Sequence, residues 1–349
     1  MIKAVDLFCG AGGLTHGLQK SGINVVAGYD IDACCRYAYE ANNNAVFIQK
    51  SVTDLDAEDF NHYFKDTNIR VLAGCAPCQP FSSYNQKSKE ENQKDAKWSL
   101  LESFGRHIKS IKPEIVTMEN VRGLVTQQVF KDFVDELNNL GYHVSYKVVY
   151  CPDYGLPQSR SRLVLLASKL GQISLIEPTH SKENHVPLIQ AIGSLPKIEA
   201  GQIHTGDHLH RSANMNALNL KRIKASKPGG SWNDWPEELV ADCHKKASGK
   251  SYASVYGRMS WEKVSPTITT QCIGFGNGRF GHPEQDRAIT LREAAILQSF
   301  PDDYKFWPEG VKMELAPVAR MIGNAVPVRL GEVVGESILK HLDEIKSTH

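Results

Sequence analysis

The first half of the chain alternates short apolar runs with helix-like segments, and this alternation constrains the fold more than any other feature. Strand-like runs lie at 4–8, 23–29, 45–48, 69–73, 115–118, 143–150 and 163–167. Helix-like periodicity lies between them at 14–21, 33–42, 99–111 and 130–140. Strands and helices that alternate at this spacing predict an α/β fold with a doubly wound, mainly parallel sheet. Such sheets bind ligands at the carboxyl ends of their strands.

The character of the chain changes near residue 168. From there to about residue 319 it is rich in Gly, Pro, Asn, His and Ser, and it shows little periodicity. Helical spacing returns over 330–342. Because 349 residues suffice for two cores, we predict a large α/β domain over 1–178 and a smaller, loop-rich domain over 179–317. The segment 318–349 is expected to complete the large domain.

Composition favours a soluble protein of the cytoplasm. No apolar run approaches the length of a membrane span, and Met1 leads within a few residues into the first strand-like run, so we expect neither a membrane segment nor a signal peptide. The eight cysteines are then expected to be free thiols. A net charge of +1 argues against a broadly basic surface, but it allows a basic cleft that binds nucleic acid.

A glycine-rich loop, Cys9-Gly10-Ala11-Gly12-Gly13, follows the first strand-like run. Glycines let the backbone approach a ligand closely, and the helix that follows offers free N–H groups. Asp30 ends the second run and is placed to accept hydrogen bonds from ribose hydroxyls. These features suit a methyltransferase about as well as a dinucleotide dehydrogenase. The loop lacks the final glycine of G-x-G-x-x-G, however, which disfavours the dehydrogenase.

Two cysteines lie on a proline-containing turn directly after the run 69–73, in the order Cys75-Ala76-Pro77-Cys78. Taken alone, this is also a C-x-x-C redox or zinc motif. A zinc site would need a second pair of ligands, and the chain holds no other C-x-x-C. A thioredoxin-like motif would open a helix after its second cysteine, which Gln79-Pro80 disfavours.

Histidines at 204, 208 and 210, with Cys243 further on, raise a second zinc hypothesis. Loop histidines without paired cysteines are more typical of polar surface or phosphate contacts, so we predict no metal.

Polar side chains with complementary chemistry follow other strands of the predicted sheet. Glu119 comes after the run 115–118, so its carboxyl is expected at the same sheet edge as Cys78. One pocket would then hold a soft nucleophile and a carboxyl able to bond a ring nitrogen. Arg160 and Arg162 lead into the run 163–167, where alternation would put both on one face. Guanidinium groups there suit a carbonyl oxygen or a phosphate.

In these residues the chain resembles a DNA (cytosine-5)-methyltransferase of the bacterial type. Six of its motifs match in order along the whole chain: Asp6-Leu7-Phe8-Cys9-Gly10-Ala11-Gly12-Gly13, Pro77-Cys78-Gln79, Glu119-Asn120-Val121, Gln158-x-Arg160-x-Arg162, Arg287 through Arg292-Glu293-Ala294 with Leu297-Gln298-Ser299-Phe300-Pro301, and Gly323-Asn324-Ala325-Val326-Pro327. The resemblance implies the class I methyltransferase fold, which is Rossmann-like, with a separate target-recognition domain.

The resemblance also implies a mechanism. The thiolate of Cys78 adds to carbon 6 of a cytosine that has been flipped out of the duplex. Glu119 bonds or protonates N3, and carbon 5 then takes a methyl group. Arg162 would bond the cytosine O2, and Arg160 would support the turn that carries the nucleophile. Cys75, which is unusual at its position, is interpreted as a bystander with a structural role.

The methyl donor implied is S-adenosylmethionine, with no metal. The residues expected to hold it are Phe8, Gly10, Gly12, Gly13, Leu14, Asp30, Ile31, Ser51, Val52, Pro77, Leu100, Asn324 and Val326. Two positions depart from the family's pattern. Ala76 stands where a proline is frequent, and Ser51 stands where an acid often receives the adenine amino group, with Asp54 three residues later.

The expected partner is double-stranded DNA, bound by a monomer. The enzyme would be encoded by a bacterium or a phage and would act in the cytoplasm, associated with the nucleoid. The enzyme would stand alone or be paired with a restriction endonuclease. A catalytically inactive DNA-binding relative is disfavoured by the intact Cys78, Glu119 and Arg162. A relative that methylates transfer RNA is disfavoured because the chain contains no Cys-Phe-Thr.

Overall fold

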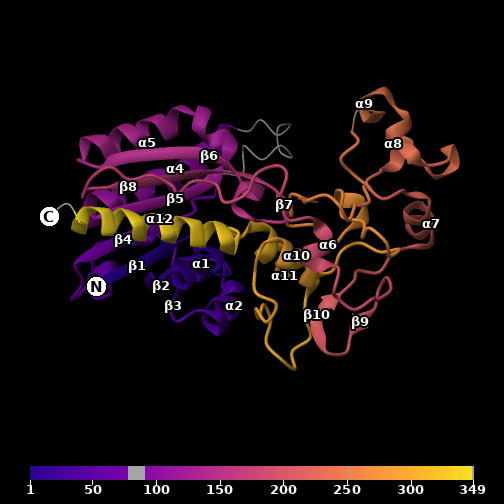
Figure 1. The fold of residues 1–349 in the computed structure, drawn as a ribbon, viewed down its shortest axis with the longest axis horizontal. Coiled ribbons are helices and arrows are strands. Elements are labelled where there is room, and N and C mark those ends of the chain that lie inside the picture. Colours follow the sequence, from indigo (N-terminus) through magenta and orange to yellow (C-terminus); the bar gives the residue numbers. More distant parts are fainter. Residues whose placement is uncertain (78–90, 251, 348–349) are drawn as a thin grey trace. The chain divides into compact units, whose positions relative to one another are not determined.

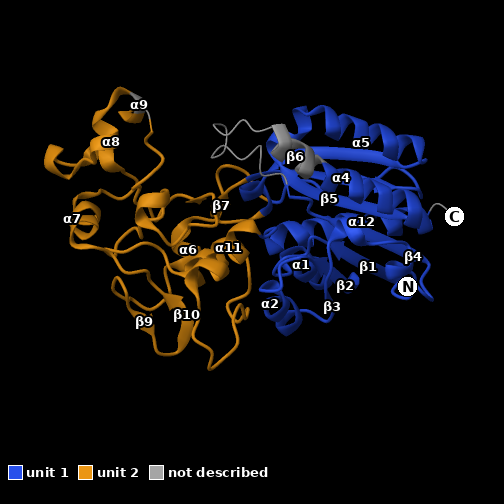
Figure 2. Ribbon diagram, turned by 180° about the vertical axis from the view of Figure 1, so that it is seen from behind, with its two compact units in different colours: residues 1–154, 161–179, 325–349 blue, residues 155–160, 180–324 orange. Residues whose placement is uncertain are grey.

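A computed structural model describes residues 1–77, 91–250 and 252–347, with the backbone alone for 91–98 and 248. The chain forms two compact units, which Figure 2 colours separately. Unit 1 comprises Met1–Tyr154, Ser161–Thr179 and Ala325–His349. Unit 2 comprises Gly155–Arg160 and His180–Asn324. The chain therefore leaves and re-enters unit 1, and its C-terminal segment belongs to the same unit as its N-terminus.

Unit 1 is built on a seven-stranded sheet in the order β3-β2-β1-β4-β5-β8-β6. The strands are β1 (Ile2–Leu7), β2 (Asn24–Asp30), β3 (Val46–Gln49), β4 (Ile69–Gly74), β5 (Ile115–Val121), β6 (His143–Tyr150) and β8 (Ser161–Ser168). All pairings from β3 to β5 are parallel, whereas β8 runs antiparallel to both β5 and β6. The predicted mainly parallel, doubly wound α/β sheet is confirmed.

Helices lie on both sides of this sheet (Figure 1). They are α1 (Gly13–Ser21), α2 (Cys35–Asn42), α3 (Glu58–Asn61), α4 (Glu91–Ile111), α5 (Gln128–Asn139) and α12 (Val328–Ser347). On one side, Val5 and Leu7 of β1 join a buried core with Phe104 of α4 and Phe133 of α5. The central strands β1, β4, β5 and β8 are buried along most of their length, as continuous apolar runs in a sheet covered on both faces predict.

Two strands near the site are longer than their apolar runs. β5 continues through Glu119, Asn120 and Val121, and β8 begins at Ser161. The added residues pair across the antiparallel ladder, with Val121 opposite Arg162. Hydrogen bonds between the strands hold these polar residues in β conformation, so the strands extend past the apolar runs from which the sequence predicts them.

The C-terminal helix α12 packs closely on α1 within unit 1. A Cβ atom on Gly17 of α1 would lie 2.3 Å from the carbonyl oxygen of Val328 and 2.7 Å from the carbonyl carbon of Gly331. Lys20 and Glu332 form an ion pair of 2.6 Å between the same helices. Glycines at the crossing let the two backbones touch, so the end of the chain lies against the helix that follows the glycine loop.

Unit 2 contains short elements connected by long loops. They are β7 (Gln158–Ser159), α6 (Leu188–Ile192), β9 (Ile203–His204), β10 (Asp207–Arg211), α7 (Ala217–Ala225), α8 (Asp242–Lys245), α9 (Ala247–Lys250), β11 (Ser265–Pro266), α10 (Leu291–Leu297) and α11 (Leu315–Asn324). One of its cores gathers Trp232, Trp235 and Phe275.

A buried ion pair stabilises the start of α10 in unit 2. Arg287 and Glu293 form two hydrogen bonds of 2.8 and 2.7 Å, and both side chains are fully buried. Glu293 also completes a capping box with Thr290. These residues lie in one of the six segments that match the family's motifs.

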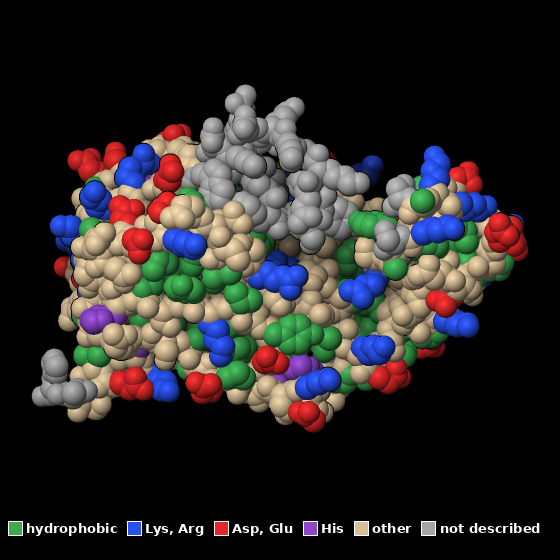
Figure 3. All heavy atoms as spheres, turned by 90° about the horizontal axis from the view of Figure 1, so that it is seen from above, with side chains coloured by type: hydrophobic (Ala, Val, Ile, Leu, Met, Phe, Trp, Pro, Cys, Tyr) green, Lys and Arg blue, Asp and Glu red, His purple; other side chains and the backbone are tan. Residues whose placement is uncertain are grey.

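Charges of both signs are interspersed over the face drawn in Figure 3, in keeping with the small net charge. Within the described ranges, no helix combines the length and the apolar character that crossing a membrane would require.

Candidate active site

The carboxyl edge of the sheet brings Glu119 and Arg162 together. Glu119 lies near the end of β5 and pairs with Val164, while Val121 pairs with Arg162 at the start of β8. Side chains two residues apart on a strand share a face, so Glu119 and Arg162 are diagonal neighbours on one face. Arg162 Nε lies 2.7 Å from Glu119 Oε1, with both side chains largely buried. An acid and a guanidinium thus meet where the sequence predicted a pocket.

The second carboxylate oxygen of Glu119 accepts a hydrogen bond from a thiol. Cys75 Sγ donates to Glu119 Oε2 at 2.8 Å and also lies 3.3 Å from the backbone oxygen of Glu119. Cys75 directly follows β4, the parallel neighbour of β5, which explains how a residue 44 positions away reaches the acid. Cys75, which the sequence suggested to be a bystander with a structural role, thus contacts the predicted acid.

The turn that leads to Cys78 is tied to the sheet by backbone contacts. The Cys75 N–H donates to the carbonyl oxygen of Leu7 on β1 at 3.2 Å. The side-chain amide of Asn120, itself buried, donates to the carbonyl oxygen of Ala76 at 2.9 Å. Pro77 is exposed and is the last residue of this turn that the structure describes. The predicted nucleophile, Cys78, lies outside the described residues.

Arg160 and Arg162 lie in different units. β8 begins at Ser161, so Arg160 precedes the strand and the alternation that we expected to align the two arginines does not apply to it. Arg160 is buried in unit 2, where its Nη1 donates to the carbonyl oxygen of Ile268 at 3.0 Å. Gln158, fully buried, accepts from the Ile268 N–H at 2.8 Å and donates to the carbonyl oxygen of Leu297. This part of the motif therefore holds unit 2 together.

The glycine loop between β1 and α1 has the conformation of a ligand cradle. Phe8, Gly10 and Gly12 have φ values of 60°, 51° and 91°, in the left-handed region. A Cβ atom added to Gly10 would have no atom of the described residues within 4 Å. Gly13 and Leu14 begin α1 and are buried. The loop thus presents backbone, rather than side chains, toward the carboxyl edge.

Asp30 fixes this loop from the end of β2. Its two carboxylate oxygens accept from the N–H groups of Gly10 and Asp32, each at 2.8 Å. Burial raises the pKa of Asp30, and the backbone hydrogen bonds oppose that rise. Ile31, the next residue, is 71% exposed, an unusual position for a large apolar side chain. A fixed carboxylate beside an exposed apolar side chain suits a nucleoside: the carboxylate would bind its ribose, and the apolar side chain would contact its base.

Asp6, on β1 just before the loop, is a buried carboxyl that the sequence analysis included in a motif but gave no role of its own. Its Oδ2 accepts from the Thr15 hydroxyl at 2.8 Å, while Oδ1 is buried and has no hydrogen-bond partner among the described residues. Burial, with a smaller contribution from the charge of Asp30, raises the pKa of Asp6 to about 7. An orphaned carboxyl oxygen next to a glycine loop fits a ligand that brings a hydrogen-bond donor or a cationic group.

The remaining predicted cofactor residues are distributed as follows. Ser51 caps the short helix Val52–Asp54 by accepting from the Thr53 N–H, and Val52 is buried. Leu100 lies partly buried in α4. Asn324 ends α11 as an exposed residue of unit 2, whereas Val326 is buried in unit 1 just before α12.

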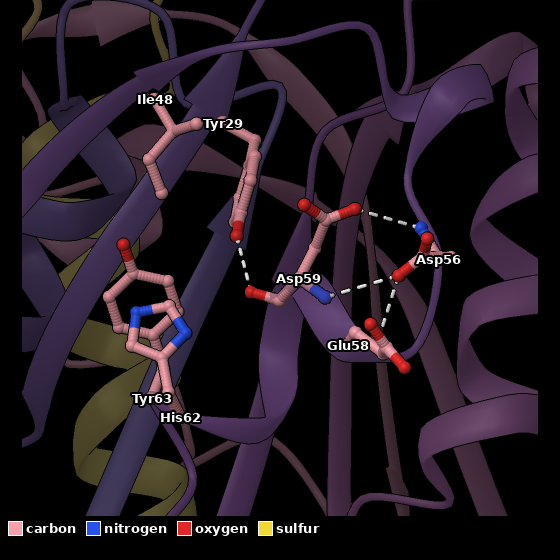
Figure 4. Close-up of a pocket in the computed structure, with 7 residues that line it drawn as sticks. All are labelled: Tyr29, Ile48, Asp56, Glu58, Asp59, His62 and Tyr63. Atoms are coloured by element: carbon pink, nitrogen blue, oxygen red, sulfur yellow. Dashed lines mark hydrogen bonds between the residues drawn. The ribbon is translucent and has the colours of Figure 1, made fainter.

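A pocket of about 340 Å³ lies elsewhere in unit 1 (Figure 4). Tyr29 and Ile48 face it from the sheet, opposite Asp56 and Asp59, and the Tyr29 hydroxyl donates to the Asp59 carbonyl oxygen at 2.7 Å. Tyr29 and Asp30 are adjacent on β2 and point to opposite faces. The pocket is therefore separate from the cradle around Asp30.

Comparison with known proteins identifies the chain. A profile of the family described as C-5 cytosine-specific DNA methylase matches residues 2–340. The Type II methylase M.HgiDII of Herpetosiphon aurantiacus is 54% identical over 347 residues, which cover 98% of this chain and 97% of that protein. The Type II methyltransferase M1.HphI of Haemophilus parahaemolyticus is 32% identical, over 96% and 86% of the two chains. The chain belongs to the C-5 cytosine-specific DNA methylase family.

The fold agrees with solved structures. A protein from an E. coli prophage, described as a DNA modification methyltransferase, superposes with a TM-score of 0.75 at 21% identity and covers 98% of this chain and 100% of its own. Dnmt2 methyltransferase of S. pombe gives a TM-score of 0.62 at 17% identity, over 99% and 100%. At these identities the likeness concerns the fold, which is that of class I methyltransferases.

Membership of the C-5 cytosine-specific DNA methylases establishes the reaction. The enzyme methylates carbon 5 of cytosine in DNA, with S-adenosylmethionine as methyl donor, through the family's covalent cysteine adduct. The Type II names of its relatives are those of restriction–modification methylases. In the described part of the chain, no three His, Cys, Asp or Glu side chains are grouped so that they could hold a metal ion.

Two contacts of this methylase were absent from the sequence prediction. Cys75 and Asn120 stand beside predicted site residues, but nothing in their local sequence shows that one reaches Glu119 and the other Ala76. Strand order carries that information, since β4 and β5 are neighbours in the sheet although α4 separates them along the chain.

Proposed function

We propose that Cys78 is the nucleophile of this cytosine methylase and that Glu119 and Arg162 hold the target base. The observation that carries the proposal is the Glu119 carboxyl, which lies between the Cys75 thiol and the Arg162 guanidinium directly beside the turn that leads into Cys78. A carboxyl fixed at that edge suits the N3 nitrogen of cytosine, and a guanidinium suits its O2 oxygen.

In the proposed reaction the Cys78 thiolate forms a carbon–sulfur bond at carbon 6. Electron density moves into the ring, and Glu119 stabilises it at N3 by a hydrogen bond or by giving a proton. When bound, S-adenosylmethionine supplies the electrophilic methyl group for carbon 5. The proton at carbon 5 then leaves to a base, the carbon–sulfur bond breaks, and the ring regains its aromaticity.

We propose that the donor is held in the cradle of unit 1. Backbone of Gly10, Gly12 and Gly13 would approach it, Asp30 would accept from its ribose, and Ile31 would cover its adenine. Phe8, Leu14, Ser51, Val52, Pro77, Leu100, Asn324 and Val326 complete the proposed set. The open space at Gly10, the exposure of Ile31 and the orphaned oxygen of Asp6 support this assignment.

Within the same proposal, unit 2 recognises the target sequence and Arg160 supports the nucleophile turn. The enzyme acts as a monomer on bacterial or phage DNA in the cytoplasm and at the nucleoid, alone or beside a cognate restriction endonuclease. The flipped cytosine leaves the stack at a cost of a few kcal/mol, which contacts with phosphates and the pocket offset.

A trapping experiment tests the catalytic assignment. DNA that contains 5-fluorocytosine should form a stable adduct with the wild-type enzyme, because fluorine at carbon 5 blocks the release step. Cys78→Ser should form none, whereas Cys75→Ser should retain the adduct. Bisulfite sequencing of DNA from cells that express the enzyme identifies the target. Formation of an adduct by Cys78→Ser would refute the assignment. So would loss of the adduct in Cys75→Ser.

A further inference from the structure

The Cys75 thiol occupies a defined place in the site. Its backbone is anchored to β1 through the Leu7 carbonyl, and its side chain points to the end of β5, where Sγ lies 2.8 Å from Glu119 Oε2. The contact joins the residue after β4 to a residue of the neighbouring strand, so the pairing of the two strands fixes its geometry.

The charge state of Cys75 makes it a donor. Burial, the nearby carboxylate of Glu119 and the hydrogen bond to it raise the pKa of the Cys75 thiol well above its usual value. At neutral pH the sulfur therefore keeps its proton, and a thiolate there would face a carboxylate at close range. Cys75 is thus suited to hold a carboxylate oxygen and unsuited to compete with Cys78 as a nucleophile.

The two oxygens of Glu119 are not equivalent. Oε2 accepts a hydrogen bond from the thiol. Oε1 is buried and faces Arg162 Nε at 2.7 Å as an ion pair, with no hydrogen bond among the described residues. The terminal torsion of a glutamate is broad and roughly two-fold, so one contact alone leaves the carboxyl plane free to rotate. The thiol contact on the opposite oxygen removes that freedom.

We propose that Cys75 is a positioning residue for Glu119: its thiol hydrogen bond, together with the ion pair to Arg162, fixes the orientation in which the carboxyl meets the cytosine ring. The proposal rests on the role proposed above for Glu119 as the group that holds N3. It assigns to Cys75 a contribution to the rate of base activation, separate from cofactor binding and from the covalent bond that Cys78 makes.

The test compares Cys75→Ala with Cys75→Ser in single-turnover methylation, with rates normalised to sites that bind S-adenosylmethionine, so that unfolded enzyme does not count. Loss of a hydrogen bond to a charged group should lower the rate of Cys75→Ala by roughly tenfold. Cys75→Ser keeps a donor and should recover most of that loss. Cys35→Ala removes a buried thiol from α2 and should leave the rate unchanged. In steady-state assays the KM for DNA should stay constant in all three variants.

A double-mutant cycle with Glu119→Gln identifies the route of the effect. If Cys75 acts through Glu119, adding Cys75→Ala to Glu119→Gln should change the slow residual rate by less than twofold. A full tenfold loss in that background would overturn the proposal, as would equal rates for Cys75→Ala and Cys75→Ser. Near wild-type activity of Glu119→Gln would instead refute the role of Glu119 itself, so the two failures are distinguishable.

Discussion

Replacing Gly17 by Ala should disrupt the packing of α12 against α1, through which the C-terminal helix completes unit 1. In most helix interiors this substitution stabilises by up to about 1 kcal/mol, because alanine has the higher helix propensity. At Gly17 the new Cβ would lie 2.3 Å from the Val328 carbonyl oxygen and 2.6 Å from the Glu332 nitrogen. Both are backbone atoms of the partner helix, so no side-chain rotation relieves the overlap.

The magnitude follows from the displacement required. Ordinary contact begins near 3.4 Å, so the helices must separate by roughly 1 Å at this point. Overpacking of this kind costs about 1–3 kcal/mol and more where backbone must move. Subtracting the propensity gain of up to about 1 kcal/mol from the upper end of that range leaves an expected net loss of about 2 kcal/mol in the free energy of unfolding of unit 1. Because α1 follows the glycine loop, weaker binding of S-adenosylmethionine should accompany it.

Urea unfolding and calorimetric titration with S-adenosylmethionine measure the two effects. Gly105→Ala in α4 is the matched control, because its new Cβ meets the flexible end of the Glu136 side chain at 3.0 Å rather than backbone. It should be neutral or slightly stabilising. If Gly17→Ala were as stable as Gly105→Ala, the close crossing of α1 and α12 would not hold in solution and the reasoning would be refuted.

Three further substitutions probe the buried polar groups. Burial raises the pKa of Asp6 to about 7, so between about pH 4 and pH 7 the folded protein holds a proton that the unfolded chain has released. The free energy of unfolding should therefore fall by up to about 4 kcal/mol as pH rises through this range. Asp6→Asn should flatten that slope in urea unfolding without ligand. Arg287→Met leaves the Glu293 charge buried and unpaired, which should cost about 3–5 kcal/mol and expose unit 2 to limited proteolysis. Asn120→Ala removes the hydrogen bond to the Ala76 carbonyl, so kcat should fall by roughly tenfold while cofactor affinity holds.

Each of these expectations has a contrary outcome. An unchanged pH slope in Asp6→Asn would mean that this carboxyl is charged or solvated in the folded state. Wild-type protease resistance of Arg287→Met would mean that the ion pair does not stabilise unit 2. For Asn120→Ala, an unchanged kcat would show that its amide does not support the nucleophile turn.

The sequence by itself determined the sheet, the glycine loop and the family. Alternating apolar runs report burial on a strand or a helix face, and short motifs such as 9–13 carry their backbone requirements locally. The strands and helices predicted in this way agree with those observed to within a few residues, except where polar residues extend β5 and β8 and where α4 begins earlier than its periodicity indicated.

The tertiary structure alone decided which side chains meet. The antiparallel entry of β8 sets Arg162 beside Glu119, and the adjacency of β4 and β5 brings Cys75 and Asn120 into the site. It also places Arg160 in unit 2 although only one residue lies between it and Arg162. These contacts depend on register between strands far apart in the chain, which no local pattern encodes. Through this register the thiol of Cys75, which the sequence suggested to be a bystander, contacts Glu119.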